Sequence, residues 1–195
     1  MIEQVVDITR RLAGHLTGRA DQLRCFNEYA SQVEGWFKGE LLWFLDEEKK
    51  AGHVLGVERE KLVRVGVKRV SVDFLLDLQA PSGSALCWTE IKHWHIGKQN
   101  GSYFGSKWYF RTQRHSACVR PDIEKLAKIP DDGARTMLRT MLILCTKNPG
   151  SQEWNEGIRI FNERNAPLRV HSLTTPEDYP EYFFLGLLDS RGGTA

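Results

Sequence analysis

The sequence has few cysteines and none of the spacings in which cysteines bind zinc or build a disulfide framework. The four, Cys25, Cys87, Cys118 and Cys145, lie far apart and include no C-x-x-C pair. This distribution fits a reducing compartment and predicts a cytoplasmic protein. No hydrophobic run approaches membrane-spanning length, and the N-terminus lacks the apolar core of a signal peptide.

Two common catalytic signatures are also missing. The sequence has no glycine-rich phosphate loop ending in Lys-Ser/Thr, so ATP-driven chemistry has no support, and no G-x-S-x-G elbow. The net charge is only +2, so an argument for nucleic acid must come from where the charges lie. We expect residues 1–195 to form a single domain, because this length suits one domain and is long enough to bury a core.

A β-hairpin is predicted around a turn at residues 80–84. Apolar residues recur at every second position over residues 70–78, and a second apolar run follows the turn. In an antiparallel pair, Asp73 and Glu90 would approach each other on a shared face. Glu90 and Lys92 would point the same way, roughly 7 Å apart along their strand. Two acids and an amine gathered on a sheet face cost desolvation energy unless they bind something.

An acid on one strand followed by acid-x-lysine on the next resembles the PD-(D/E)XK nuclease superfamily. The matching residues are Val72-Asp73 and Glu90-Ile91-Lys92, and the resemblance covers roughly residues 40–125. It implies an α/β fold with a restriction-endonuclease-like core, in which a mixed central sheet is flanked by helices. The predicted order of a helix and three strands in a meander is the layout that this superfamily requires.

The resemblance also implies a metal site and a catalytic lysine. Asp73, Glu90 and the Ile91 carbonyl would hold Mg²⁺, with Mn²⁺ as a substitute. Lys92 would orient or deprotonate the attacking water, or stabilise the charge that develops on the phosphate. Because nearby carboxylates favour the protonated amine, Lys92 suits an electrostatic role better than that of a base. The alternative is a surface charge pair of Glu90 and Lys92 on an edge strand, worth under about 1 kcal/mol.

A further candidate acid lies on a predicted helix. Apolar residues at three- and four-residue spacing predict one helix over residues 2–16 and a longer one from Asp21 to about Lys50. Glu40 lies among aromatic residues of the longer helix, an inconsistency that often marks a functional site. By the resemblance, Glu40 would hold a second metal ion or a metal-bound water. The alternative is a surface glutamate paired with Lys38 or a nearby arginine.

A basic and aromatic segment follows Lys92, because no Asp or Glu occurs between that residue and Pro121. Interspersed glycines predict a flexible loop over residues 96–106. We expect its cations to hold phosphates and its aromatic residues to stack on bases or pack beneath the loop; the alternative is an ordinary surface loop over core aromatic residues. The predicted nucleic-acid-binding residues are Lys98, Lys107, Arg111, Arg114, His93 and His95.

His93 and His95 share a strand face and would suit a transition metal. No third nitrogen or sulfur ligand has supporting spacing, so phosphate contacts or plain surface histidines fit the sequence better. The remaining predicted elements are a strand over 54–65 that ends at a turn at Gly66, a helix opening at Pro121, a helix from Asp131 or Asp132 through Arg139, a strand over 141–145, a helix around Trp154, Ile158 and Phe161, and strands over 169–173 and 183–188.

Three functional hypotheses follow. The first is a Mg²⁺-dependent nuclease, with DNA favoured over RNA by the resemblance alone. The second is a nucleic-acid-binding module that keeps the same fold without cleavage. The third is an unrelated α/β protein, in which Asp73 and Glu90 would lie on opposite faces. Besides nucleic acid, the resemblance implies a homodimer or a protein partner, since small nucleases of this kind often act with one.

Overall fold

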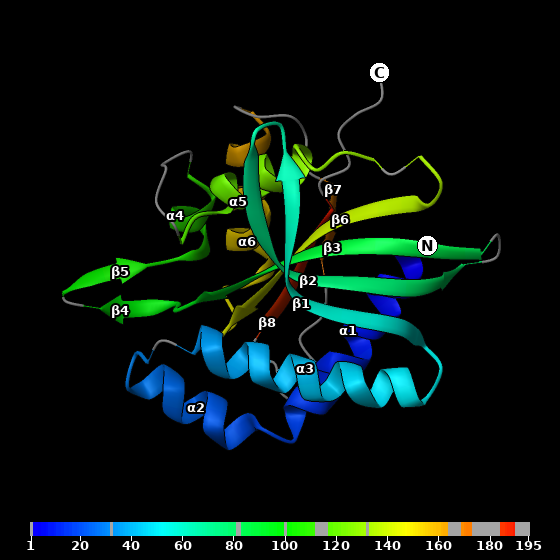
Figure 1. Ribbon diagram of the computed structural model, residues 1–195. Helices are drawn as coiled ribbons and strands as arrows, with labels where there is room; N and C mark the ends of the chain where they lie inside the picture. Colours follow the sequence, from blue (N-terminus) through cyan, green and yellow to red (C-terminus); the bar gives the residue numbers. More distant parts are fainter. Residues whose placement is uncertain are drawn as a thin grey trace.

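A six-stranded mixed sheet with the strand order β1-β2-β3-β6-β8-β7 forms the centre of the computed structural model (Figure 1). β3 and β6 are parallel, and the other neighbouring strands are antiparallel. The strands are β1 (Val54–Val65), β2 (Lys68–Ala80), β3 (Gly83–Trp94), β6 (Thr136–Cys145), β7 (Arg169–Ser172) and β8 (Phe184–Asp189). The structure describes residues 2–31, 33–80, 83–99, 101–111, 117–131, 133–163, 169–172 and 184–189.

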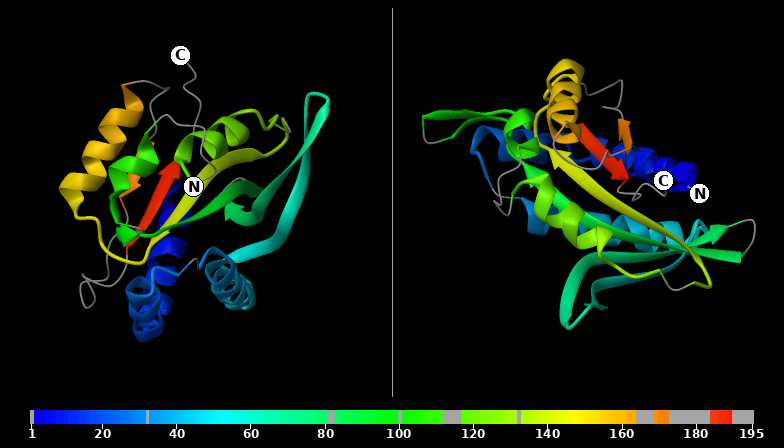
Figure 2. Two further views of the ribbon diagram at one scale, coloured as in Figure 1. Left: turned by 90° about the vertical axis from the view of Figure 1, so that its left-hand side faces the viewer. Right: turned by 90° about the horizontal axis from the view of Figure 1, so that it is seen from above.

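Helices cover both faces of this sheet (Figure 2). α1 (Ile2–Thr17) and α3 (Glu34–Lys50) pack on one face, where their apolar residues join a core with Phe74, Ile91 and Leu142. α4 (Ser106–Phe110), α5 (Val119–Ala127) and α6 (Ser151–Asn162) cover the other face. Among the described helices, none is both long and apolar enough to cross a membrane.

The predicted long helix from Asp21 to Lys50 is wrong, because the chain forms two helices there. α2 (Ala20–Glu28) ends before Ala30, whose φ of 48° is incompatible with a continuing right-handed helix. The Ser31 N–H donates to the Phe26 carbonyl and closes the turn. Phe26 also packs edge-on against Trp36, which lies on α3. The break lets apolar residues on both helices reach the same core.

The predicted flexible loop over residues 96–106 is also wrong. Within it, β4 (Gly97–Gln99) and β5 (Ser102–Phe104) pair as a second, two-stranded sheet. The segment that follows packs inward, because Trp94 stacks on Tyr109 at a centroid distance of 4.6 Å and meets Phe110 edge-on. Core packing, the alternative considered for these aromatic residues, therefore applies to Tyr109 and Phe110.

The predicted helix that ends at Arg139 is wrong as well. Residues 136–145 form β6, whose residues from Leu138 onward are buried on both faces apart from a half-buried Arg139. Arg139 donates to the Ile129 carbonyl and the Asp131 carboxylate, each at 2.7 Å, and so fixes the start of the strand. Asp132 lies outside the described residues.

The other predicted elements are confirmed in substance. The helix over residues 2–16, the strand over residues 54–65 and the hairpin around residues 80–84 occur as predicted. The helix expected at Pro121 begins two residues earlier, and the later helix is α6. The last two predicted strands are β7 and β8, although their predicted end residues Leu173 and Phe183 lie outside the described residues.

Close packing of α6 on α4 gives a first testable prediction. A methyl group at Gly157 would collide with the Phe110 ring, whereas one at Gly14 on α1 would meet nothing within 4 Å. Gly157→Ala is expected to lower the free energy of unfolding by about 1–3 kcal/mol, because overpacking outweighs the gain in helix propensity. Gly14→Ala is the matched control and should gain up to about 1 kcal/mol. Urea unfolding measures both, and equal stabilisation by the two would contradict this packing.

Candidate active site

The candidate site lies where β2 turns away from β3. In a regular strand, Val72 and Phe74 would face the same side. Instead, Val72 packs with Leu126 on the α5 side, and Phe74 packs with the α1 and α3 core. On β1, Glu60 has a φ of 48° at the same level, between the pairs Arg59–Phe74 and Lys61–Val72. The β1–β2 hairpin therefore bends at Asp73 and rises from the sheet (Figure 1).

This bend opens the edge of β3 beside Glu90. The last described pair of the two strands is Phe74 with Thr89, so Asp73 and Glu90 are the next residues on each strand. Asp73 replaces the missing strand partner, because its Oδ2 accepts the Ile91 N–H at 2.8 Å. The carboxylate of Asp73 is thereby held next to the Glu90-Ile91-Lys92 segment.

α5 supplies two partners to this segment. The Lys125 Nζ lies 2.6 Å from the Glu90 Oε1 and 3.3 Å from the Asp122 Oδ1. The Lys92 Nζ lies 2.8 Å from the Asp122 Oδ2. Neither Asp122 nor Lys125 was predicted as a site residue. Their three-residue spacing on a helix that follows the ExK strand was the available signal.

α3 supplies the partner of Asp73. The Lys38 Nζ lies 2.8 Å from the Asp73 Oδ1 and 3.0 Å from a Glu34 carboxylate oxygen. Lys38 thus reaches Asp73 from one helix layer, whereas Lys125 reaches Glu90 from the other. The Asp73 carboxylate lies close enough to Glu90 to raise its pKa, although the lysine partners of the two acids come from opposite layers rather than from one regular sheet face as expected from the hairpin alone.

Glu40 does not join this cluster. Its Oε2 lies 3.0 Å from the His15 Nε2, and both of its oxygens lie 3.3 Å from the Arg19 Nε. Glu40 therefore links α3 to α1 and to the residue that precedes α2. The alternative of an ion-paired glutamate describes this residue, although its partners are His15 and Arg19 rather than Lys38. The predicted role in a second metal site does not fit this placement.

A substitution separates the two roles of Glu40. Glu40→Gln is expected to lower stability by about 1 kcal/mol, because it removes a partly buried charged hydrogen-bond partner. Any cleavage activity should remain within about twofold of the wild type, because Glu40 contacts none of the clustered residues. Thermal unfolding and a cleavage assay measure the two effects. A large loss of cleavage in a folded Glu40→Gln variant would show that Glu40 belongs to the active site.

Burial makes Glu90 an unusual acid. Its side chain is 3% exposed, and this desolvation is the main cause that raises its pKa from an ordinary 4.5 to about 7. The Asp73 and Asp122 carboxylates raise the pKa further, and Lys125 opposes them. A carboxyl group poised near neutral pH in a charged cluster is typical of functional sites, although structural ion-pair networks also produce it.

The donor atoms at the bend are carboxylate oxygens, which are the type of ligand that a hard divalent cation binds. Within the described part of the chain, no three side chains of His, Cys, Asp or Glu are arranged to hold a metal by themselves. Mg²⁺ does not need such a cage, because it usually keeps several waters and takes one or two carboxylates together with substrate phosphates. Asp73 and Glu90 offer those two carboxylates, with Lys38 and Lys125 now placed as their counter-ions.

The predicted phosphate-binding residues divide into two groups. His93 and His95 are each only 6% exposed, and burial lowers the pKa of His93 to about 4. A buried, neutral imidazole does not offer a positive charge to phosphate, so the predicted phosphate contact has no support at His93 or at His95, whose pKa burial also lowers. Lys98, Lys107 and Arg111 are exposed as expected. Arg114 lies outside the described residues.

Lys107 and Arg111 line a pocket of about 470 Å³ on the α4 side of the molecule. Tyr103 and Trp108 line the same pocket, and Tyr103 is 60% exposed. Cations beside an exposed aromatic ring are the combination that binds single-stranded nucleic acid. Lys107 and Arg111 have the expected exposure, whereas the two histidines do not, and binding of nucleic acid by Lys107 and Arg111 stays a prediction.

Comparisons of this chain with protein-family models, curated proteins and solved structures find no match.

Proposed function

We propose that this protein is a metal-dependent nuclease of the PD-(D/E)XK type that hydrolyses phosphodiester bonds, with DNA as the expected substrate. One observation carries the proposal. The bend in β2 holds Asp73 against the Ile91 N–H, beside the buried Glu90. The arrangement gathers the acid and the ExK motif from separate strands, as the resemblance implies.

The order of elements supports the same proposal. α3 is followed by the meander β1, β2 and β3, within a mixed sheet that helices cover on both faces. This is the layout expected of a restriction-endonuclease-like core. The motif residues lie in its second and third strands, and the exposed cations Lys98, Lys107 and Arg111 lie on the segment that follows β3.

The chemistry assigns a separate task to each residue. In hydrolysis, a water oxygen bonds to phosphorus while one P–O ester bond breaks, which leaves a phosphomonoester and an alcohol. A bound Mg²⁺ would neutralise phosphate charge and favour deprotonation of water. Asp73, Glu90 and the Ile91 carbonyl would hold that ion. Lys92, fixed by Asp122, would stabilise the negative charge that develops on the phosphate.

Lys38 and Lys125 would compete with the cation. Both ammonium groups pair with the carboxylates that the proposal assigns to Mg²⁺. The charge of each carboxylate is therefore already compensated in the protein alone. This arrangement stabilises a cluster that would otherwise repel itself, at the cost of weaker metal affinity.

A cleavage assay on plasmid DNA, single-stranded DNA and RNA tests this function. Cleavage is expected with Mg²⁺ or Mn²⁺ and is expected to stop in EDTA. Substrate preference among the three then names the substrate class. Equal cleavage with metal and with EDTA would refute a metal-dependent mechanism.

One observation favours a second function, a nucleic-acid-binding module without cleavage. Asp73, Glu90 and Asp122 each already pair with a lysine, as in a polar network that needs no ion. Salt-sensitive DNA binding that is indifferent to Mg²⁺, with no hydrolysis of any substrate, would support this module and reject the nuclease.

A further inference from the structure

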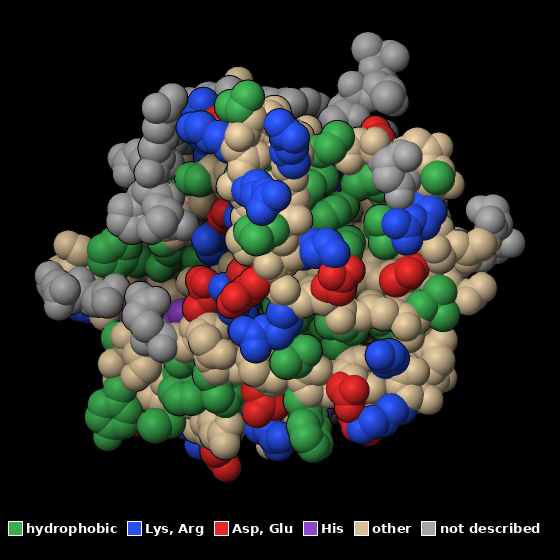
Figure 3. Space-filling view, viewed as in Figure 1, with side chains coloured by type: hydrophobic (Ala, Val, Ile, Leu, Met, Phe, Trp, Pro, Cys, Tyr) green, Lys and Arg blue, Asp and Glu red, His purple; other side chains and the backbone are tan. Residues whose placement is uncertain are grey.

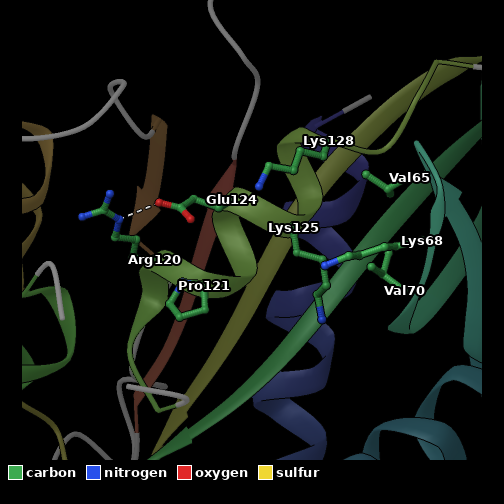
Figure 4. A pocket seen from close by; sticks show the side chains of 8 residues that line it. All are labelled: Val65, Lys68, Val70, Arg120, Pro121, Glu124, Lys125 and Lys128. Atoms are coloured by element: carbon green, nitrogen blue, oxygen red, sulfur yellow. Dashed lines mark hydrogen bonds and ion pairs between the residues drawn. The ribbon is translucent and has the colours of Figure 1, made fainter. Parts of the chain in front are cut away.

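A second basic pocket lies between the tip of the β1–β2 hairpin and α5 (Figure 4). Its volume is about 500 Å³, which lies within the range of ligand sites. The hairpin contributes Val65, Lys68 and Val70, α5 contributes Arg120, Pro121, Glu124 and Lys125, and Lys128 directly follows α5. The pocket exists because the hairpin bends at Asp73 and its tip stands opposite the helix. Of the cations in this pocket, only Arg120 lies in the basic segment that was expected to hold phosphates.

The charge of the pocket is strongly positive. Four of its lining residues are cationic, and its single acid, Glu124, is paired with Arg120 at 2.6 Å. Lys68 and Lys128 are exposed and form no ion pair with any described residue. In Figure 4, Lys68 extends from the hairpin toward α5, from which Lys125 projects, and Lys128 lies at the end of this helix. Lys and Arg side chains also lie along the hairpin surface in Figure 3.

Lys125 connects this pocket to the candidate active site. The residue lines the pocket, and its ammonium group contacts Glu90 at 2.6 Å. It also accounts for part of the electrostatics of the site, because it lowers the pKa of Glu90 against the effect of burial. The single side chain of Lys125 therefore separates the pocket from the carboxylate of Glu90.

We propose that this pocket binds a backbone phosphate of a nucleic-acid strand, next to the phosphate at the carboxylate cluster. The proposal rests on the proposed function, because it takes the cluster as the place of the reacting phosphate. Lys68 and Lys128 contact the phosphate, and the apolar surface of Val65, Val70 and Pro121 faces the sugar. The hairpin and α5 contact the nucleic-acid strand from two sides.

Charge complementarity selects this ligand class. A chain of phosphates offers one negative charge per nucleotide, so a strand that occupies both the cluster and the pocket meets cations at successive phosphates. Phosphate contacts made by lysine ammonium groups position a strand without reading its sequence. The pocket therefore contributes affinity and register for any sequence.

The test uses the full chain in EDTA, so that no cleavage interferes. Binding of a labelled duplex and of a labelled single strand is followed by fluorescence anisotropy at several salt concentrations. The double variant Lys68→Gln/Lys128→Gln is expected to bind about tenfold more weakly than wild type at about 0.1 M salt. Its slope of log K against log salt should be shallower by about 0.9 for the duplex and about 0.7 for the single strand, because the contact with one phosphate is lost.

The matched control is the double variant Lys49→Gln/Lys50→Gln. It removes the same charge from two exposed lysines at the C-terminal end of α3, away from the pocket. The control should keep the wild-type slope and lose less than about twofold in affinity. Equal losses in both double variants would show general charge attraction and overturn the pocket, as would wild-type protein that binds no nucleic acid.

The experiments can reject the phosphate-binding pocket and the nuclease function independently of each other. Binding that weakens only in Lys68→Gln/Lys128→Gln, in a protein that cleaves nothing with any metal, would keep the pocket and reject the enzyme. Metal-dependent cleavage combined with an unchanged slope in that variant would keep the enzyme and overturn the pocket.

Discussion

Glu90→Gln is expected to abolish metal-dependent cleavage, with a rate at least about 10³-fold below that of wild type. Loss of a single transition-state electrostatic contact commonly costs about 10²–10³-fold, and a metal ligand contributes at least as much. The amide keeps the size of the carboxyl group but carries no charge for the cation. Plasmid nicking at a fixed Mg²⁺ concentration measures the effect. Asp73→Asn should produce a similar loss, while its amide oxygen still accepts the Ile91 N–H.

Two controls show whether this loss is chemical rather than structural. Glu58→Gln makes the same chemical change at an exposed position on β1, paired with Lys61, and should leave cleavage unchanged. Glu90→Gln should unfold in urea at no lower concentration than wild type at pH 8, because burial penalises the charged carboxylate that it removes. Cleavage at the wild-type rate by a folded Glu90→Gln variant would show that the ExK motif does not take part in the reaction.

The sequence predicts local pairing well. The two-residue alternation of β2, the turn residues at 80–84 and the short apolar run of β3 are all consistent with one antiparallel register. That register is sufficient to place Asp73 beside Glu90. The bend at Asp73 has no comparable signal, because it depends on Glu60 across the β1–β2 pair and on packing against α5.

The helix partners of the site could not be predicted from local pattern. Glu40 and Lys38 are two positions apart on α3, so they point roughly 200° apart around the helix axis. Only one of them can face Asp73, and the docking of α3 on α1 decides which. Lys38 faces the site, and Glu40 turns toward His15 and Arg19. Helical spacing gives the angle between the Glu40 and Lys38 side chains, but it does not give the side of α3 that faces the sheet.

Several of the other wrong predictions have a common cause. The basic composition after the ExK motif predicts a surface segment, yet β3 continues through His93 to Trp94 beneath α4 and α6. Similarly, the local pattern before Arg139 predicts a helix, although pairing with β3 places residues 136–139 in the sheet. Parallel pairing joins segments about fifty residues apart in the sequence, and local patterns carry no information about it.

Acidic pH should suppress cleavage through Glu90. With its pKa near 7, the fraction of ionised Glu90 falls about tenfold between pH 8 and pH 6, and kcat/KM at low Mg²⁺ should fall in proportion. Stability of the metal-free protein should change in the opposite direction. Between the ordinary pKa of 4.5 and about 7, the folded state binds the extra proton, so stability decreases as pH rises through 7. Initial rates and urea unfolding in EDTA, each followed from pH 5.5 to 8.5, measure the two trends.

Lys125→Met identifies the titrating group. Because the Lys125 ammonium lowers the pKa of Glu90, its removal should move the midpoint of the kcat/KM profile to higher pH. Lys128→Met removes the same charge about one turn further along, in the residue that follows α5, from a side chain that forms no ion pair with Glu90. This control should leave the midpoint in place, whatever it does to DNA affinity. Glu90→Gln should in turn remove the pH dependence of stability near pH 7. An unchanged midpoint in Lys125→Met would assign the titration to another group and separate Glu90 from the pH response.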